Sequence, residues 1–355
     1  MADPKSGASS FSLFDLFRRP EAGAAAGFIL IFLFFAWFGV DKNFLTALGS
    51  STWLNFASKV GIIAIPIGFL MIAGELDISI GAVIPAGGIV LAMGTELYGL
   101  NIWLAFAMSI TICGAIGFVN GMIVTRTKVP SLIVTLATLF VVAGLNAYVS
   151  KGLAGTTQHS LQDVGVVSEF ILGDYHSLVF GEGDDKVTIF RSLQSSFFIF
   201  ILVAVVCYFI LHVSPWGNWI FALGGDQESA RNAGIPTSGL KIALFMLSAI
   251  AAGLVGMTEA VLANTASTTT QFGMIFNTII CVVVGGVLLT GGFGTVTGTV
   301  FGTLTFGIVF QGINFTTFDK DLNMLFIGVL LLVAVLMNDT FRDWATRAST
   351  SKKSS

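Results

Sequence analysis

Charged residues are scarce in this sequence. Asp, Glu, Lys and Arg make up 10% of its 355 residues, whereas a soluble globular domain carries about 25%. Apolar residues make up 55%, and the mean hydropathy is +0.89. The apolar stretches are long and continuous rather than alternating, which excludes a transmembrane β-barrel. The composition therefore predicts an all-α polytopic membrane protein, in which the 41 glycines let helices pack closely.

Cysteine and histidine are also rare. The three cysteines all lie inside apolar stretches and are expected to be reduced packing residues: Cys113, Cys207 and Cys281. The three histidines are too far apart in sequence to suggest a metal set: His159, His176 and His212. No nucleophile–base pair and no nucleic-acid signature is recognisable. We therefore expect no catalytic residue, no metal and no cofactor in this chain.

A nucleotide-binding loop is missing as well. The turn Gly291-Gly292-Phe293-Gly294 is rich in glycine, as phosphate-binding loops are, but it lacks their lysine and Ser/Thr. No Gly-Lys dipeptide occurs anywhere in the chain. We therefore expect no ATPase site in this protein, so that any ATP and magnesium it depends on are bound by a partner.

Ten apolar segments are long enough, or nearly so, to cross a bilayer. They lie near Gly23–Val40, Val60–Ala73, 81–99, Ile102–Thr125, Ser131–Ser150, Ser196–Val213, Leu240–Ala263, Phe276–Thr290, Thr297–Thr316 and Leu322–Asn338. Residues 41–59 carry charge and are expected to form a loop with a partial helix. An even number of spans places both termini on one side of the membrane.

The basic residues set the expected orientation. With both termini in the cytoplasm, eleven of the 17 lysines and arginines fall inside and six outside, which obeys the positive-inside rule. The predicted organisation is a cytoplasmic tail at 1–22, one transmembrane domain at 23–338 and a cytoplasmic tail at 339–355. Within that domain, 151–195 is expected to be an acidic external loop and 214–239 a cytoplasmic loop.

A polar stretch, residues 223–235, interrupts the apolar sequence and predicts a short capped helix. Asp226 suits the N-cap, Glu228 the first turn and Arg231 the last turn, while Gly234 suits the left-handed position that ends a helix. A helix of about two turns is unstable alone and must dock onto something. The stretch is either a docking helix at the membrane surface, with Ala230 and Ala233 on its small face, or an ordinary connector.

The same stretch carries a resemblance. The pattern Gly224-Gly225-x-x-x-x-Ala230-Arg231-x-x-Gly234-Ile235 is similar to the cytoplasmic coupling loop of sugar-type ABC importer permeases, the ribose-transporter family. In that family the loop inserts into a cleft of the ATP-hydrolysing subunit. The resemblance implies an ATPase-coupling role for a set of residues here: Gly224, Gly225, Asp226, Glu228, Ala230, Arg231 and Gly234.

Three further motifs resemble the same family, in the same order. They are Glu75-Leu-Asp-Ile-Ser-Ile-Gly81, Val129-Pro-Ser-Leu-Ile-Val-Thr-Leu-Ala-Thr138, and the glycine run 285–302. We expect gating or helix packing from Asp77, Ser79, Gly81, Gly291, Gly292, Gly294 and Gly298. A charge inside a membrane is costly. Either Asp77 or Ser79 only caps the following helix, or the group has a role in gating or in pairing two helices. Phe293 departs from the family, which often has a polar residue there.

A solute path needs hydrogen-bonding groups with aromatic faces beside them. The candidates inside the spans are Asn120, Asn277, Phe276, Gln311 and Asn314, with Phe310 and Phe315 as further aromatic groups. Amides in membranes also serve as links between helices. Thr135 and Thr138 either bond back to their own helix or face the path. Glu259 is a carboxylate within a span, and the resemblance gives it no role.

Together the motifs indicate the permease of an ABC importer for a monosaccharide or related polyol, in a bacterial inner membrane. The resemblance implies a second permease copy, two ATP-binding subunits and a periplasmic substrate-binding protein as partners, besides membrane lipid. Two alternatives stay open. One is a permease of the branched-chain amino-acid type. The other is an ion-coupled secondary transporter in which Glu75, Asp77 and Glu259 carry the ion.

Overall fold

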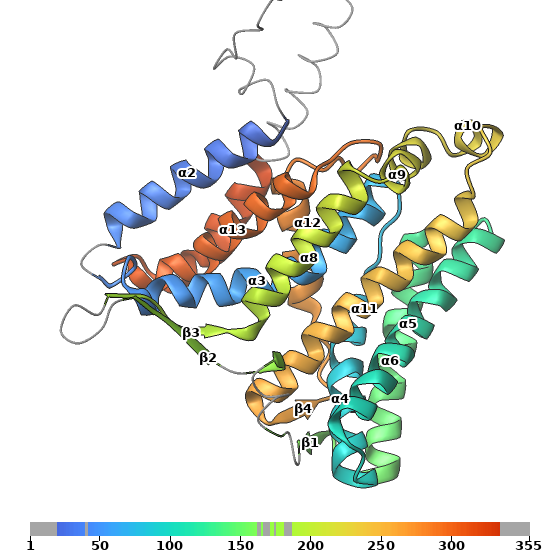
Figure 1. Cartoon of the computed structure of the whole chain (residues 1–355), viewed down its shortest axis with the longest axis horizontal. Coiled ribbons are helices and arrows are strands. Elements are labelled where there is room, and N and C mark those ends of the chain that lie inside the picture. Colours follow the sequence, from blue (N-terminus) through green and yellow to red (C-terminus); the bar gives the residue numbers. More distant parts are fainter. Residues whose placement is uncertain are drawn as a thin grey trace, which may run out of the picture.

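The computed structural model describes residues 20–39, 42–161, 165, 171–173, 175–180 and 187–333. In this part of the chain, eight helices are long and apolar enough to cross a membrane (Figure 1). They are α2 (Pro20–Phe38), α3 (Ala47–Ile72), α4 (Ile80–Tyr98), α5 (Ile102–Arg126), α6 (Ser131–Ala154), α8 (Ser195–His212), α11 (Thr237–Ala263) and α13 (Val296–Gly312). The predicted all-α polytopic fold class is confirmed.

Two of the ten predicted spans do not correspond to any of these eight long helices. The segment predicted at Phe276–Thr290 is a shorter helix, α12 (Phe272–Val284), followed by the glycine-rich turn. After the 3₁₀ turns η3 (Ile313–Phe315) and η4 (Lys320–Leu322), residues 323–333 are helical. The rest of the predicted span Leu322–Asn338 lies outside the described residues. The number of spans and the sidedness of the termini therefore stay predictions.

The structure corrects the loop with a partial helix that was expected at 41–59, because most of this segment is helical. Helix α3 begins at Ala47, where the Thr46 hydroxyl accepts a 3.2 Å hydrogen bond from the Gly49 backbone N–H. It then continues through Lys59 without a break to Ile72. The sequence interpretation treated the charge of Lys59 as the boundary of a membrane span. A lysine is tolerated inside a span when a neighbouring helix offers it a carboxylate partner. Lys59 lies 3.8 Å from Glu259 of α11.

Helices α3, α4 and α11 form the centre of the bundle. α11 packs on α4 and α5, and α6 covers the far side of α4, while α13 packs on α2 and α3 (Figure 1). Small residues allow α4 and α11 to cross with their backbones in contact. A Cβ atom at Gly87 would overlap the backbone of Gly253, and one at Gly256 would overlap the carbonyl oxygen of Ile84. Only glycine lets these two backbones touch.

Short strands mark one end of the bundle, called here the strand end. β1 (Gln158–Ser160) pairs antiparallel with β4 (Thr265–Ser267), His159 lying opposite Ala266. β2 (Tyr175–Phe180) pairs antiparallel with β3 (Val187–Gln194). The acidic residues predicted for the external loop lie outside the described residues: Asp163, Glu169, Asp174, Glu182, Asp184 and Asp185.

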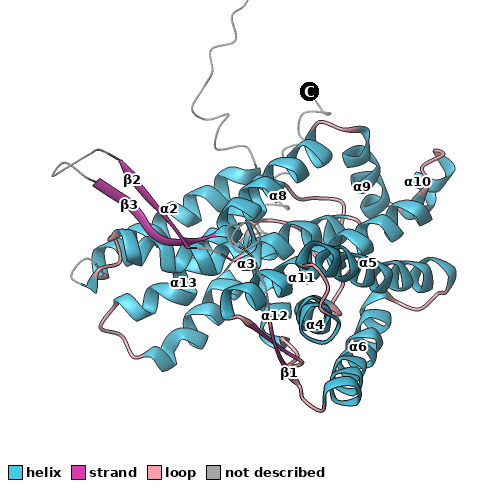
Figure 2. Ribbon diagram, turned by 60° about the horizontal axis from the view of Figure 1, so that its bottom comes forward, coloured by secondary structure: helices cyan, strands magenta, loops and turns pink. Residues whose placement is uncertain are grey.

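Two short helices mark the opposite end, called here the α10 end. α9 (Pro215–Gly225) leads into α10 (Gln227–Asn232), which projects away from the bundle (Figure 2). Helix α11 follows directly and runs back to β4. Its 27 residues span about 40 Å at 1.5 Å per residue. The two ends are therefore separated by roughly the thickness of a membrane.

Candidate functional site

The capped helix predicted from the polar stretch is present as α10. Asp226 accepts a 2.6 Å hydrogen bond from the Ser229 backbone N–H, and this bond holds the pKa of the Asp226 carboxyl below its usual value. Gly234 adopts a φ of 85° just after the helix, as predicted. Ala230 is buried, whereas Glu228, Arg231 and Ala233 are exposed. The helix therefore rests on Ala230 alone of the two predicted small residues and presents charged side chains outward.

Three glycine-containing segments meet at the end of α9, just before α10 begins. A Cβ atom at Gly224 would overlap the carbonyl oxygen of Ile72 and lie 2.6 Å from the backbone nitrogen of Gly292. That nitrogen donates a 2.8 Å hydrogen bond to the same Ile72 oxygen. Gly291 has a φ of 84°, and a Cβ there would lie 3.1 Å from the Cα of Gly74. The end of α9, the end of α3 and the glycine-rich turn thus touch backbone to backbone.

The remaining glycines of the coupling loop and of the glycine run differ in how closely other atoms approach them. Gly298 packs on the backbone of Gly285, which brings the start of α13 against the end of α12. A Cβ at Gly294 would lie 2.8 Å from a Val287 methyl group, whereas one at Gly225 would meet nothing within 4 Å. Phe293 is 41% exposed at the tip of the turn.

A buried ion pair ties α10 to the motif that begins at Glu75. The Lys241 ammonium, near the start of α11, is paired with the Glu75 carboxylate and donates a 2.8 Å hydrogen bond to Gln227 Oε1 of α10. The Lys241 and Glu75 side chains are 8% and 10% exposed. A buried charge is tolerated only when it is paired and hydrogen-bonded. The sequence interpretation treated Lys241 only as a cytoplasmic charge and missed this pair.

Asp77 is the centre of a buried polar network. One carboxylate oxygen accepts from the Ser79 backbone N–H at 2.9 Å and from its hydroxyl at 2.5 Å, and the other accepts from Ser248 of α11 at 2.9 Å. Ser79 Oγ in turn accepts from Asn120 of α5 at 3.0 Å, and Thr138 of α6 donates to the Asn120 amide oxygen at 2.6 Å. Asp77 therefore holds Ser79, the N-cap residue of α4, without capping the helix itself, and its network links α4 to three other helices.

The backbone between α3 and α4 is not helical, and α6 provides its hydrogen-bond partners. The Leu76 N–H donates to Ser131 Oγ at 3.1 Å, and the Ile78 N–H donates to Thr135 Oγ1 at 3.3 Å. Thr135 also bonds back to the Ser131 carbonyl at 2.9 Å. Irregular backbone at membrane depth is stable only when neighbouring helices satisfy it in this way. The motif 129–138 thus stabilises the motif 75–81 by accepting hydrogen bonds from its backbone.

The predicted path residues are not gathered in one place. Asn120 belongs to the Asp77 network. Phe276 is 64% exposed on α12 beside the partly buried Asn277. At the end of α13, Asn314 donates a 3.3 Å hydrogen bond to Gln311. Phe310 stacks on Phe56, and Phe315 packs edge-on against Phe44. Their assignment to a solute path stays a prediction.

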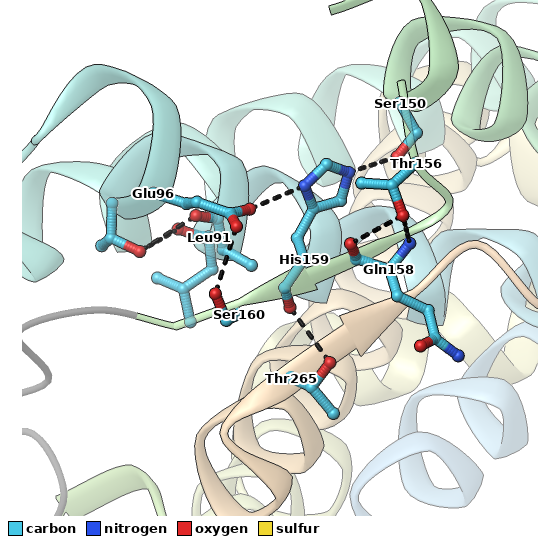
Figure 3. Close-up of polar contacts among 10 residues, drawn as sticks. Leu91, Glu96, Ser150, Thr156, Gln158, His159, Ser160 and Thr265 are labelled. Atoms are coloured by element: carbon cyan, nitrogen blue, oxygen red, sulfur yellow. Dashed lines mark hydrogen bonds and ion pairs between the residues drawn. The ribbon is translucent and has the colours of Figure 1, made fainter. Parts of the chain in front are cut away.

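A second polar cluster, at the strand end, was not foreseen from the sequence (Figure 3). His159 Nε2 lies 2.6 Å from Ser150 Oγ of α6, and its Nδ1 lies 2.8 Å from Glu96 Oε2 of α4. Ser160 donates to the other Glu96 oxygen at 3.1 Å. The order Ser–His–Glu is that of a hydrolase triad, but Ser150 and His159 are fully buried. The cluster fastens β1 to the ends of α4 and α6.

No metal site is recognisable at either end. Among the residues that the structure describes, no three His, Cys, Asp or Glu side chains gather closely enough to hold a metal ion. The cysteines Cys113, Cys207 and Cys281 are all buried and free.

Comparison with known proteins places these features in context. A family described as "branched-chain amino acid transport system / permease component" matches residues 49–335. The inner membrane ABC transporter permease YjfF of Escherichia coli is 30% identical over 78% of this chain and 80% of its own. The L-arabinose permease AraH of Azospirillum brasilense is 30% identical over 90% and 88%. The ribose permease RbsC of Bacillus subtilis is 26% identical over 84% and 87%. No solved structure matches the chain.

Proposed function

This chain belongs to the permease family of sugar-type ABC importers, and we propose that it carries a monosaccharide or related polyol across the bacterial inner membrane. Arabinose, ribose and fructose permeases among its relatives favour a sugar over an amino acid, although the family's description names the latter. It is a multi-pass membrane protein. A separate subunit hydrolyses the ATP and binds it with magnesium.

The observation that carries the proposal is the construction of the α10 end. A capped helix projects there, with Glu228 and Arg231 outward, and its root is fixed by direct backbone contact at Gly224. An ATP-binding subunit closing on α10 displaces a rigid unit rather than a mobile loop. In this proposal the α10 end faces the cytoplasm, and the coupling residues are those named from the family's loop.

The buried pair gives the displacement a route into the bundle. Gln227 of α10 holds Lys241, Lys241 holds Glu75, and Glu75 lies two residues before Asp77. Asp77 contacts α11 through Ser248 and the start of α4 through Ser79. A shift of α10 is thereby passed to the non-helical segment between α3 and α4. That segment is where two orientations of α4 relative to α11 can interconvert.

The proposed assembly holds two permease copies, two ATP-binding subunits and one periplasmic substrate-binding protein. The exposed side of α12, with Phe272 and Phe276, is left uncovered in the single chain. A second copy packed there would place Phe276 and Asn277 beside a central path. The binding protein selects the solute before it reaches the permease, so the path itself needs little selectivity.

Co-purification and uptake test the proposal. The solubilised permease is expected to retain an ATP-binding subunit and, once the importer is reconstituted in liposomes, to accumulate labelled sugar only with ATP. Arg231→Glu and Gly234→Val are expected to lower uptake at least about tenfold, because each alters the docking helix. An exchange on the connecting turn at the other end, Thr156→Ala, serves as control. Ion-driven uptake by the permease alone would overturn the proposal.

A further inference from the structure

Helix α11 carries an ion-pairing residue near each of its ends, and both partners belong to α3 or to the chain just after it. Lys241, near the start of α11, is in direct contact with Glu75, which follows α3. Glu259, near the finish, lies 3.8 Å from Lys59 within α3. Along α11 the two positions are about 27 Å apart, at 1.5 Å per residue. The two helices are therefore tied at two levels, by a closed pair at the α10 end and by an open pair at the strand end.

The two pairs differ in what it costs to separate them. The Lys241 and Glu75 side chains are 8% and 10% exposed, so separation would leave two charges buried without partners. The Lys59 and Glu259 side chains are 22% and 32% exposed, so water can solvate both when they part. The closed pair therefore suits a permanent contact, whereas the open pair can separate and close repeatedly.

A cavity of about 530 Å³ at the strand end gives the open pair room to move. Lys59 and Glu259 both line it, and the distance between their charged atoms exceeds that of a direct hydrogen bond. Gln194 lines it as well, and its side-chain oxygen is buried without a hydrogen-bond partner in the described part of the chain. A buried acceptor of this kind calls for a donor from elsewhere. Lys59 is the cation among the described lining residues, and its ammonium has three hydrogens to donate.

The start of α12 is bound to the helices on the Glu259 side of the open pair. Gln271, the N-cap residue of α12, donates a 3.3 Å hydrogen bond from its side chain to Glu259 Oε2. Its backbone N–H donates at 2.8 Å to the carbonyl oxygen of Gly81, where α4 begins. That oxygen is available because Pro85, four residues later, has no N–H. The start of α12 therefore follows α4 and α11 when these helices move.

The other end of α12 is held by α13. A Cβ atom at Gly302 of α13 would overlap the carbonyl oxygen of Cys281, so the two backbones touch. Helix α13 in turn packs on α3, where a Cβ atom at Gly307 would lie 3.0 Å from the carbonyl oxygen of Trp53. α12 thus bridges two groups of helices. A change in the distance between the end of α11 and α3 must tilt it.

We propose that Lys59 and Glu259 form a latch at the strand end, which closes to direct contact at one stage of transport and separates at another. The inference rests on the proposed function and gives a role in it to two residues outside the coupling loop. When the latch closes, the end of α11 approaches α3 and carries the start of α12 with it, while the closed pair remains intact as the pivot. Phe276 and Asn277 of α12, which border the proposed central path, change position as a result. The cavity is the clearance for this movement, and the solute passes beside α12.

The latch also accounts for a carboxylate within a membrane span. Such a group is costly unless it is paired or faces water. With the latch open, Glu259 is solvated through the cavity, and with the latch closed it is neutralised by Lys59. Glu259 is therefore tolerated at both stages.

Exchange of the two charges tests the latch. Lys59→Glu and Glu259→Lys each replace attraction by repulsion, so ATP-driven sugar uptake by the complete importer is expected to fall at least about fivefold. The double exchange Lys59→Glu with Glu259→Lys restores the attraction, and uptake should return to within about twofold of the wild type. Gln271 can serve either charge, because an amide both donates and accepts. Lys151→Glu, which reverses an exposed charge at the same end, is the control and should transport normally.

A thiol in the cavity wall reports the movement itself. Ser267→Cys lines the cavity and the native cysteines are buried, so a maleimide should report on the new thiol. In the complete importer held in nanodiscs, its labelling rate is expected to differ at least about threefold between the nucleotide-free state and a state trapped with ATP and vanadate. Lys59→Glu should abolish that difference, because its latch cannot close. Thr156→Cys, exposed at the same end and outside the cavity, should label at one rate throughout.

The outcomes separate the latch from the proposed function. Normal uptake by both single reversals, no rescue by the double exchange, or a Ser267→Cys labelling rate that does not depend on nucleotide overturns the latch. Should a single reversal fail to fold, the nucleotide dependence of Ser267→Cys in the otherwise wild-type chain still decides. Sugar uptake by the reconstituted wild-type importer is measured in parallel. With that uptake present, such results sink the latch alone, whereas absence of sugar uptake with ATP sinks the proposed function.

Discussion

The two ends of the bundle each hold a lysine–glutamate pair, and the pairs differ in exposure and in the distance between their charged atoms. Lys241 and Glu75, at the α10 end, are about one-tenth exposed and in direct contact, with Gln227 completing the set. Lys59 and Glu259, at the strand end, are 22% and 32% exposed and stand 3.8 Å apart at a cavity. The first pair is buried and hydrogen-bonded to Gln227, which suits a group that transmits a displacement between helices. The second is partly exposed and loosely paired, and both of its residues line a cavity at the strand end.

Removal of the closed pair's cation should have the largest effect. Lys241→Met leaves the Glu75 carboxylate buried without a partner, which costs about 3–5 kcal/mol in comparable pairs. The expected result is a marked loss of thermal stability of the solubilised permease, or of its ability to use ATP for uptake. The double exchange Lys241→Met with Glu75→Leu should recover most of the stability and none of the coupling. Full uptake by the single variant would show that the pair transmits nothing.

A methyl group at Gly224 should have the next largest effect. Gly224→Ala forces the Ile72 carbonyl and the Gly292 amide apart, and overpacking of this kind costs about 1–3 kcal/mol. Gly239→Ala, near the start of α11 and outside the coupling residues, is the matched control, because its Cβ would meet nothing within 4 Å. Uptake per ATP hydrolysed, measured in liposomes, should fall for the first variant only. Equal behaviour of the two variants would remove the glycine contact from the coupling route.

The open pair should contribute least to stability. Lys59→Met removes a partly exposed interaction, and such pairs are worth at most about 1 kcal/mol. Its thermal midpoint should therefore stay close to that of the wild type, in contrast with Lys241→Met. A stability loss as large as that of Lys241→Met would mean that the two ion pairs stabilise the fold equally.

Local signals in the sequence were sufficient for the helices and for α10. Apolar length predicts the spans, and Asp226 with Gly234 predicts both ends of the docking helix, because these effects act within a few residues. The same local view placed a loop at 41–59, since nothing near Lys59 in sequence indicates its distant partner Glu259. Charge was therefore mistaken for a boundary.

The site itself depends on contacts between distant segments. Glu75 and Lys241 are 166 positions apart, and Asp77 and Ser248 are 171 apart. The four motifs were visible one by one, but their contacts are a property of the packed bundle. The coupling loop and the glycine run meet at Gly224 and Gly292, and the motif 129–138 meets the motif 75–81 at Leu76 and Ile78. The His159 cluster and the cavity are likewise assembled from separate helices. No single stretch of sequence carries either signal.

The contact among Gly224, Ile72 and Gly292 has a mechanical consequence. Side-chain contacts absorb small displacements, because rotamers adjust before the backbone moves. Here no side chain intervenes, and the three main chains lie against one another. A displacement of α10 is therefore transmitted through rigid backbone contacts, and the C-terminal end of α3 must move with it.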